Sequence, residues 1–149
     1  MSWMRSQFNP KMHTLFVPEN IEKYHGNVPI VMRSKMESKF ARWCDNSSNV
    51  VMWSSETLKI PYFNPVKKRK ANYYPDFIVK FLNNKIYIIE LKPEKECYKP
   101  VYSKRKNLLL EQSKFIINRC KWNACKAYCD QFGYSFMVIT NESLKNKQI

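Results

Sequence analysis

The sequence predicts a single domain of the mixed α/β class, with a mixed central sheet flanked by helices. Its 149 residues are 44% hydrophobic, which is enough to build one buried core. Apolar residues recur at helical spacing ahead of a group of short β-rich segments, and a second helical stretch precedes one last apolar strand. The expected order is therefore a helix, three or four strands, a second helix and a final strand.

The N-terminal part is expected to form an irregular arm that packs on the core. Proline and glycine punctuate it and leave little periodicity. Its aromatic residues, such as Phe8 and Phe16, would be costly to leave in water, which argues against a disordered tail. We expect an arm over residues 1–30, the main domain over residues 31–141 and a flexible polar tail over residues 142–149.

The first helix is predicted over residues 35–45, because apolar residues recur there on one face. Four β-rich segments follow, and they span residues 49–53, 58–63, 73–82 and 85–91. Pro61 makes the second segment an edge or bulged strand. The two asparagines at positions 83 and 84 supply the turn of a hairpin between the last two segments.

A second helical region is predicted from residue 104 to residue 128 or 130, with a break near residues 119–121 left open. Gly133 lies where a helix-terminating glycine belongs. The last strand is predicted over residues 134–140.

The balance of charge indicates a nucleic-acid partner. The chain carries 26 Lys and Arg residues against 12 Asp and Glu, a formal net charge of +14, which a phosphate-rich partner explains better than solubility alone. No apolar run approaches the roughly 20 residues needed to span a bilayer, so no membrane partner is expected. The five cysteines, without a secretion signal, fit a reducing cytosol and no disulfide framework.

Two basic clusters are the candidate DNA-contact residues. Exposed charges of this kind hold phosphates without reading sequence, and a solvated loop is the simpler alternative for each cluster. The candidates are Lys67, Lys68, Arg69, Lys70, Lys104, Arg105 and Lys106. Lys114, Arg119 and Lys121 would extend the same surface.

Asp76, Glu90 and Lys92 are the candidate catalytic residues. Glu90 and Lys92 are two apart on one predicted strand, so their side chains share a face, and Asp76 lies on the neighbouring strand of the hairpin. Mg²⁺, with Mn²⁺ as a substitute, needs only one or two carboxylates when substrate phosphates complete its shell, and the Leu91 carbonyl is a further candidate ligand. Together these groups suit metal-assisted phosphodiester hydrolysis. The alternative is a Glu90–Lys92 ion pair on an exposed sheet face.

This site depends on the length of the hairpin turn. A two-residue turn would pair Asp76 with Leu91 and put Asp76 and Glu90 on opposite faces of the sheet. A three-residue loop, or a bulge beside Pro75, would restore a common face. We therefore predict one of these irregularities.

Glu37 is a fourth candidate, because it lies in the first turn of the predicted helix and could lean toward the hairpin. The run from Ser34 to Glu37 also fits a capping box, in which the glutamate accepts a hydrogen bond from the start of the helix. Both roles stay open from the residues alone, and they do not exclude each other.

These motifs resemble the PD-(D/E)xK nuclease superfamily, with Pro75-Asp76 and Glu90-Leu91-Lys92 as the two halves of its signature. A longer series of motifs, in the same order along the chain, resembles the head completion nucleases of T4-type tailed bacteriophages. These motifs are Asn9-Pro10, Tyr24-His25-Gly26, Arg33-Ser34 with Glu37, Trp53-Ser54-Ser55-Glu56, Ile60-Pro61-Tyr62, Tyr74-Pro75-Asp76-Phe77 and Ile89-Glu90-Leu91-Lys92-Pro93. The chain is also similar, more distantly, to the TnsA-like endonucleases of bacterial transposons.

The resemblance implies a restriction-endonuclease-like core and a Mg²⁺-dependent endonuclease that acts on double-stranded DNA while the DNA-filled phage head is finished. It implies capsid or portal proteins as partners, and the cytoplasm of the infected bacterial host, or the virion head, as the place of action. It also makes Glu37 an active-site acid that binds the metal directly or through a water. Two alternatives stay open: a TnsA-like transposition endonuclease, and a structural DNA-binding head protein with a vestigial site.

Overall fold

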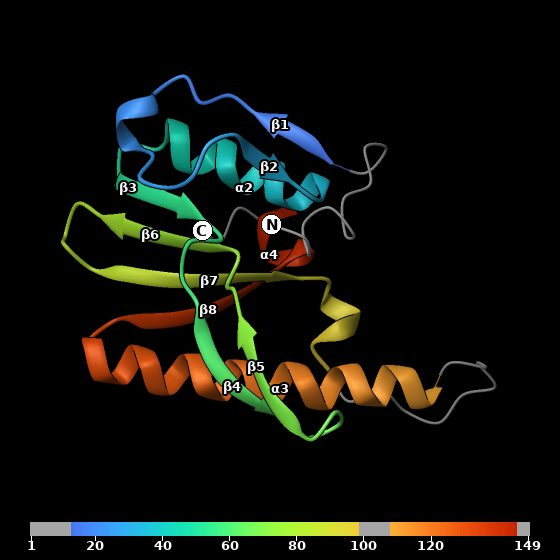
Figure 1. Cartoon of the computed structure of the whole chain (residues 1–149). Helices are drawn as coiled ribbons and strands as arrows, with labels where there is room; N and C mark the ends of the chain where they lie inside the picture. The colour runs from blue at the N-terminus through green and yellow to red at the C-terminus, as the bar shows by residue number, and fades with distance from the viewer. Residues whose placement is uncertain (1–12, 99–107, 146–149) are drawn as a thin grey trace.

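The structure, a computed structural model, describes residues 13–98 and 108–145 of the chain (Figure 1). Its centre is a four-stranded sheet in the order β3-β6-β7-β8. The first three strands pair antiparallel, whereas β7 and β8 pair parallel. Their bounds are β3 (Val50–Ser55), β6 (Phe77–Phe81), β7 (Ile86–Lys92) and β8 (Ser135–Thr140). This confirms the predicted mixed α/β fold.

Helix α2 (Lys35–Asn46) covers one face of the sheet. The Ser34 hydroxyl caps it by accepting a hydrogen bond from the Glu37 N–H at 3.1 Å. Phe40, on the buried side of α2, packs on Phe77 of β6 with ring centroids 4.8 Å apart. The first hydrophobic core forms around this contact, and it includes Val79 of β6 and Ile89 of β7.

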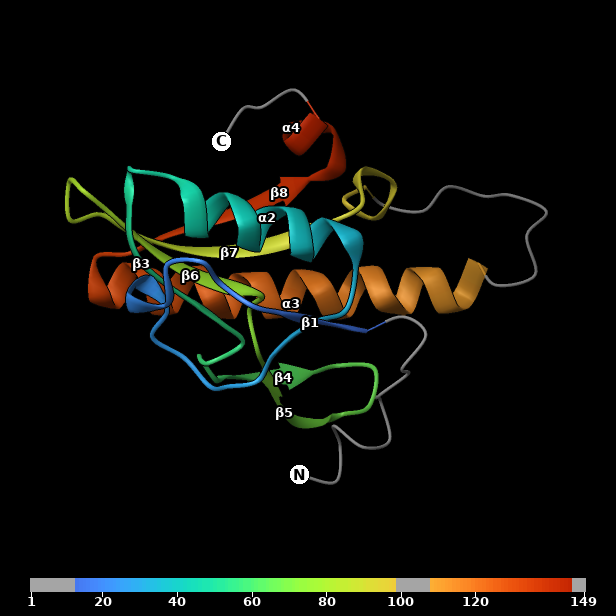
Figure 2. The same ribbon diagram turned by 90° about the horizontal axis from the view of Figure 1, so that it is seen from above.

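Helix α3 (Leu108–Phe132) covers the opposite face (Figure 2). Trp122 and Cys125 of α3 pack with Ile88 of β7 in a second core. Gly133 ends the helix with φ 73°, as predicted, and the Tyr134 N–H donates to the Cys129 carbonyl at 2.9 Å. The break allowed near residues 119–121 does not occur, because neither proline nor glycine interrupts that stretch. A parallel crossover from β7 through α3 to β8 results.

A two-stranded ribbon, β4 (Ile60–Asn64) paired with β5 (Arg69–Tyr73), extends beside α3. The prediction of one strand over residues 73–82 is therefore wrong at its start, since Tyr73 ends β5 and pairs with Ile60. The chain leaves one strand and begins the next around Pro75, whose ring removes the N–H that a continuous ladder would need. The ribbon and the sheet thus meet directly before Asp76.

The described part of the N-terminal arm is more regular than expected. Strand β1 (Thr14–Phe16) pairs antiparallel with β2 (Ile30–Met32), and a 3₁₀ turn η1 (Ile21–Lys23) lies between them. Phe16 and Tyr24 are buried in the first core. Strands of three residues are too short to show alternation in sequence, which is why they were missed.

The segment after β8 also differs from the expected tail. It forms a short helix α4 (Asn141–Lys145), capped by the Thr140 hydroxyl, which accepts from the Ser143 N–H at 3.2 Å. Leu144 packs against the first core. A second 3₁₀ turn, η2 (Glu94–Glu96), follows β7. None of the helices in the described part of the chain has the length and apolar character needed to cross a bilayer.

Candidate active site

The hairpin between β6 and β7 turns through three residues, which confirms the predicted irregularity. Phe77 lies opposite Ile89, and the Phe81 N–H donates to the Lys85 carbonyl at 3.0 Å. Asn84, the last residue of the loop, has φ 67°, the left-handed conformation that three-residue hairpin loops use. The same register, continued past the start of β6, sets position 76 opposite position 90. The two carboxylates therefore share one face of the sheet.

Asp76 is anchored on the backbone of β7. Its Oδ2 accepts the Leu91 N–H at 2.8 Å. The N–H and C=O of one strand residue project to the same side, so the Leu91 carbonyl is directed to the side of Asp76. Pro75, which this register sets opposite Leu91, has no N–H to donate to that carbonyl. The Asp76 carboxylate is thus fixed on the side of β7 to which the Leu91 carbonyl is directed.

Glu90 and Lys92 project from β7 on the α3 side, as does Ile88. The Lys92 Nζ lies 3.8 Å from the Glu90 carboxylate, so the ion pair considered as an alternative does form. It is not on an exposed face, however, because Glu90 is only 6% exposed. Burying a carboxylate is costly unless its charge is compensated, and a single amine at this distance compensates it incompletely.

Glu37 reaches the same region from the first turn of α2. Its Oε2 accepts the Arg33 N–H at 3.1 Å, one residue before the Ser34 cap, so it holds the chain that enters the helix and does not complete the predicted capping box through the Ser34 N–H. Burial raises the pKa of Glu37, and the nearby charges of Glu56 and Glu90 raise it further. Glu56 in turn forms an ion pair with the Arg33 side chain. Glu37 therefore holds the chain that enters α2 and also lies within electrostatic reach of Glu90.

The acidic cluster formed by Glu37, Asp76 and Glu90 carries an excess of negative charge. Burial raises the pKa of Asp76 well above its ordinary value, and repulsion from Glu90 and Glu37 adds to the effect. A divalent cation would relieve this repulsion. In the described ranges, no three Asp, Glu, His or Cys side chains are grouped so that they alone could hold a metal ion. Mg²⁺ does not need one, because it keeps waters and shares substrate phosphates, so the oxygen donors present here fit it.

Two further residues face this cluster from the α3 side, and sequence reasoning gave neither a role in the site. Lys121 was considered only as an extension of the DNA-contact surface, yet it is half-buried, with its Nζ 5.8 Å from the centre of the Tyr73 ring. Tyr73 is buried at the end of β5. One signal was available: Lys121 lies one helical turn before Cys125, on the buried side of the helix.

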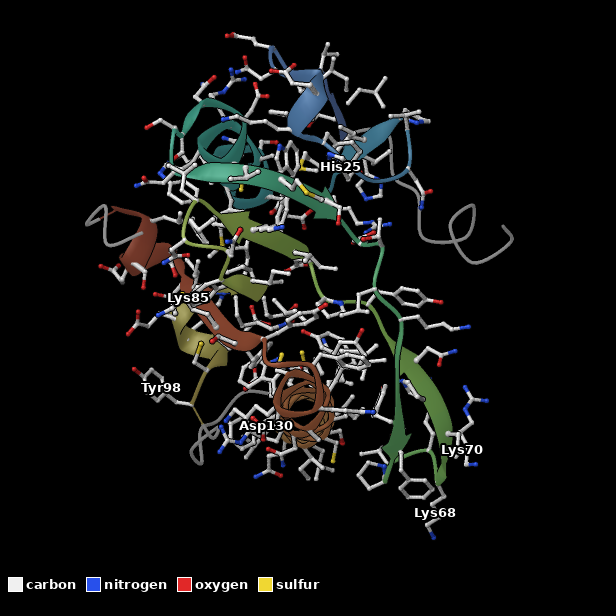
Figure 3. The ribbon with its side chains drawn as sticks, turned by 90° about the vertical axis from the view of Figure 1, so that its left-hand side faces the viewer. His25, Lys68, Lys70, Lys85, Tyr98 and Asp130 are labelled. Carbon is white, nitrogen blue, oxygen red and sulfur yellow. The ribbon has the colours of Figure 1, made fainter. Side chains whose placement is uncertain are left out.

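The first basic cluster lies at the tip of the ribbon, on exposed residues. Lys67 and Lys68 are in the turn, and Arg69 and Lys70 begin β5. The Asn64 Oδ1 accepts the Lys67 N–H at 3.0 Å and so fixes the turn. Lys68 and Lys70 project from the ribbon on its side away from α3 (Figure 3). The second predicted cluster, Lys104, Arg105 and Lys106, lies outside the described residues.

Known proteins match this chain over most of its length. Residues 47–141 match the family model described as TnsA-like endonuclease N terminal. The head completion nuclease of Enterobacteria phage T4 is 32% identical over 137 residues, which is 87% of this chain and 91% of that protein. Asp76, Glu90 and Lys92 lie inside the stretch that the family model matches, whereas Glu37 precedes it.

Proposed function

From the premise that this chain belongs to the family of TnsA-like endonucleases and has their restriction-endonuclease-like fold, we propose that it is a Mg²⁺-dependent DNA endonuclease of phage head completion. One observation carries the proposal. The three-residue hairpin loop brings Asp76 and Glu90 to one face of the sheet, next to the Lys92 amine. Two carboxylates and an amine in this arrangement suit the hydrolysis of a phosphodiester.

Asp76, Glu90 and the Leu91 carbonyl would hold the metal, with Glu37 joining them directly or through a water. When bound, Mg²⁺ supplies Lewis-acid chemistry that activates water and neutralises charge on the phosphate, and Mn²⁺ would substitute for it. Asp76 is positioned for this by the Leu91 N–H, which fixes one of its oxygens. The excess of negative charge in the acidic cluster supports a cation there.

Lys92 supplies the positive group of the reaction. Its ammonium lies beside Glu90 on the α3 side, where it would orient the attacking water or stabilise the negative charge that develops on the phosphate. Lys92 is half-buried, so its charge is less screened than that of a surface lysine.

Double-stranded DNA is the proposed substrate. The basic tip of the ribbon would hold its phosphates outside the acidic cluster, since Lys67, Lys68, Arg69 and Lys70 are all exposed. The net charge of +14 favours such a polyanionic partner.

The place of action is proposed from the phage T4 relative, whose name assigns it to head completion. The protein would act in the cytoplasm of the infected bacterium or in the virion head, where capsid or portal proteins are the expected partners. The family model equally allows a transposition endonuclease, but the match to the phage protein covers more of the chain. A vestigial site is disfavoured, because buried, mutually repelling carboxylates are costly to retain without a use.

The test is cleavage of supercoiled plasmid in Mg²⁺ by the wild type, Asp76→Asn and Glu90→Gln. Both variants keep the shape of the side chain, and we expect each to lower the rate about 1,000-fold or more, since they remove metal ligands and transition-state charge. The matched control is Asp130→Asn, an exposed aspartate of α3, which should cleave like the wild type. Equal nicking by Asp76→Asn and the wild type would indicate a contaminant. No nicking by any of them in Mg²⁺ or Mn²⁺ would favour a structural head protein.

A further inference from the structure

Lys121 occupies an unusual position for a lysine. It lies in the middle of α3, half-buried, one helical turn before the fully buried Cys125. This places its side chain on the sheet side of the helix rather than in solvent. Its Nζ lies 5.8 Å from the centre of the Tyr73 ring, and the charges of Glu90 and Asp76 both act on it.

The half-buried ammonium has little direct compensation. Among the described residues, no carboxylate lies close enough to form an ion pair with Lys121, and Glu90 already pairs with Lys92. The Tyr73 ring offers a cation–π contact worth roughly 0.5–2 kcal/mol, which is less than the usual cost of burying a charge. The amine is therefore held at the acidic cluster without a full partner.

Tyr73 adds a second unsatisfied group at the same place. Its hydroxyl is buried and faces the Glu90 carboxylate, but it completes no hydrogen bond of good distance and angle in the described part of the chain. Burial raises the pKa of Tyr73, and the neighbouring Glu90 charge raises it further, so the hydroxyl keeps its proton. An ammonium and an O–H donor thus both lie on the α3 side of Glu90, where each could serve an incoming anion.

We propose that Lys121 is a substrate-binding residue of the active site, which contacts a non-bridging oxygen of the DNA phosphate at the acidic cluster, and that Tyr73 positions it. This rests on the proposed nuclease function and goes further, because it assigns the substrate phosphate to the side formed by α3. A phosphate there would meet Lys121 and Lys92 together, whereas the ribbon tip binds phosphates further along the DNA. A charge-assisted contact of this kind is stronger than one made by an exposed lysine.

The experiment uses Lys121→Met, Lys121→Arg and, as the matched control, Lys126→Met, an exposed lysine of the same helix. Two measurements are made: the single-turnover cleavage rate in Mg²⁺, and the salt dependence of binding to a short duplex in Ca²⁺. We expect Lys121→Met to cleave about 10- to 100-fold more slowly and to lower the slope of log K against log salt by about one, as one lost phosphate contact does. Lys121→Arg should keep the slope, and Lys126→Met should keep the rate.

The outcomes separate this inference from the proposed function. Cleavage by the wild type, with an unchanged rate and slope in Lys121→Met, overturns the inference and leaves the nuclease standing. A wild type that does not cleave overturns the proposed function, and the salt slope in Ca²⁺ still decides whether Lys121 meets a phosphate. A lower melting temperature in Lys121→Met with an unchanged slope would assign Lys121 a structural role and overturn the inference.

Discussion

At the scale of single residues, Glu37 shows how one carboxylate serves both the helix and the site. Its Oε2 accepts the Arg33 N–H and so fixes the chain just before α2, while the Ser34 hydroxyl caps the helix by accepting the Glu37 backbone N–H. The charge of Glu90 acts on the same carboxylate. The hydrogen bond from the Arg33 N–H requires an accepting oxygen but not a negative charge, whereas binding of a metal ion requires the charge.

Glu37→Gln separates these two roles, because glutamine keeps an accepting oxygen and loses the charge. We expect its melting temperature in EDTA to equal or exceed that of the wild type, because glutamine keeps the hydrogen bond and removes the repulsion from Glu56 and Glu90. The Mg²⁺ concentration for half-maximal cleavage should rise about 10- to 100-fold. Glu37→Ala should show the same shift in Mg²⁺ dependence and be about 0.5–1.5 kcal/mol less stable than Glu37→Gln, measured by urea unfolding, because the hydrogen bond from the Arg33 N–H is also lost.

Glu142→Gln is the control for this pair, since Glu142 is an exposed glutamate in the first turn of α4. It should leave the Mg²⁺ dependence unchanged. An unchanged Mg²⁺ dependence in Glu37→Gln as well would leave Glu37 with only its hydrogen bond to the Arg33 N–H.

At the scale of elements, the ribbon and the β6–β7 hairpin have separate tasks. The hairpin loop sets the register that brings Asp76 and Glu90 together. The ribbon carries the basic cluster on a turn that the Asn64 side chain holds in place. The two elements are joined through Pro75, so the basic tip and the acidic cluster are parts of one continuous stretch of chain.

The ribbon prediction is tested by replacing its four cations together with glutamine, at Lys67, Lys68, Arg69 and Lys70. Each lost phosphate contact lowers the slope of log K against log salt by about 0.9, so we expect a fall of up to about 3 to 4 for duplex DNA in Ca²⁺. Cleavage at saturating DNA should change little, because these residues lie away from the acidic cluster.

Lys85→Gln is the control, because Lys85 is an exposed lysine in the other hairpin turn, on the far side of the molecule from the ribbon tip (Figure 3). It should keep the wild-type slope. A quadruple variant with the wild-type slope would mean that DNA does not touch the ribbon.

At the scale of the whole molecule, the acidic cluster lies at the end of a sheet that separates two hydrophobic cores. α2 and its core lie on one side, and α3 with the ribbon lies on the other. In a protein with a net charge of +14, the three carboxylates of the cluster nevertheless lie within electrostatic reach of one another. The fold therefore keeps a repulsion that lowers its own stability when no cation is present.

Asp76→Asn should consequently stabilise the metal-free protein while abolishing cleavage. The folded state holds a proton on Asp76 more tightly than the unfolded chain does, because the pKa of Asp76 is raised from 3.8 on folding. Stability from this group is therefore present at low pH and is lost as the pH rises through the raised pKa. We expect the variant to be more stable by about 1–3 kcal/mol at pH 7.5 in EDTA. The difference should shrink as the pH falls.

Thermal unfolding of both proteins between pH 4 and pH 8 in EDTA measures this, with Asp130→Asn as the control that should follow the wild type. A variant less stable than the wild type at pH 7.5 would show that the Asp76 charge is compensated in the metal-free protein. The charge argument for a cation at this position would then fail.

Much of the fold follows from local patterns, and the exceptions have particular causes. The span of α2, the glycine that ends α3 and the strand β8 were predicted from periodicity and residue type. Strand β5 was missed because most of Arg69–Tyr73 is exposed, so alternation is weak. The length of the hairpin loop could not be predicted from the sequence, because two adjacent asparagines suit a loop of two or three residues.

The sequence by itself determined the chemistry available: two carboxylates and an amine on neighbouring strands, a glutamate at a helix start and a basic surface. These depend on residue type and on spacings of a few positions, which a sequence states directly. Only the tertiary structure decided which groups meet. Glu37, Glu90 and Lys121 come from three separate elements and Asp76 from the connection before β6. Their distances are set by the packing of two helices on opposite faces of one sheet, which no local pattern encodes.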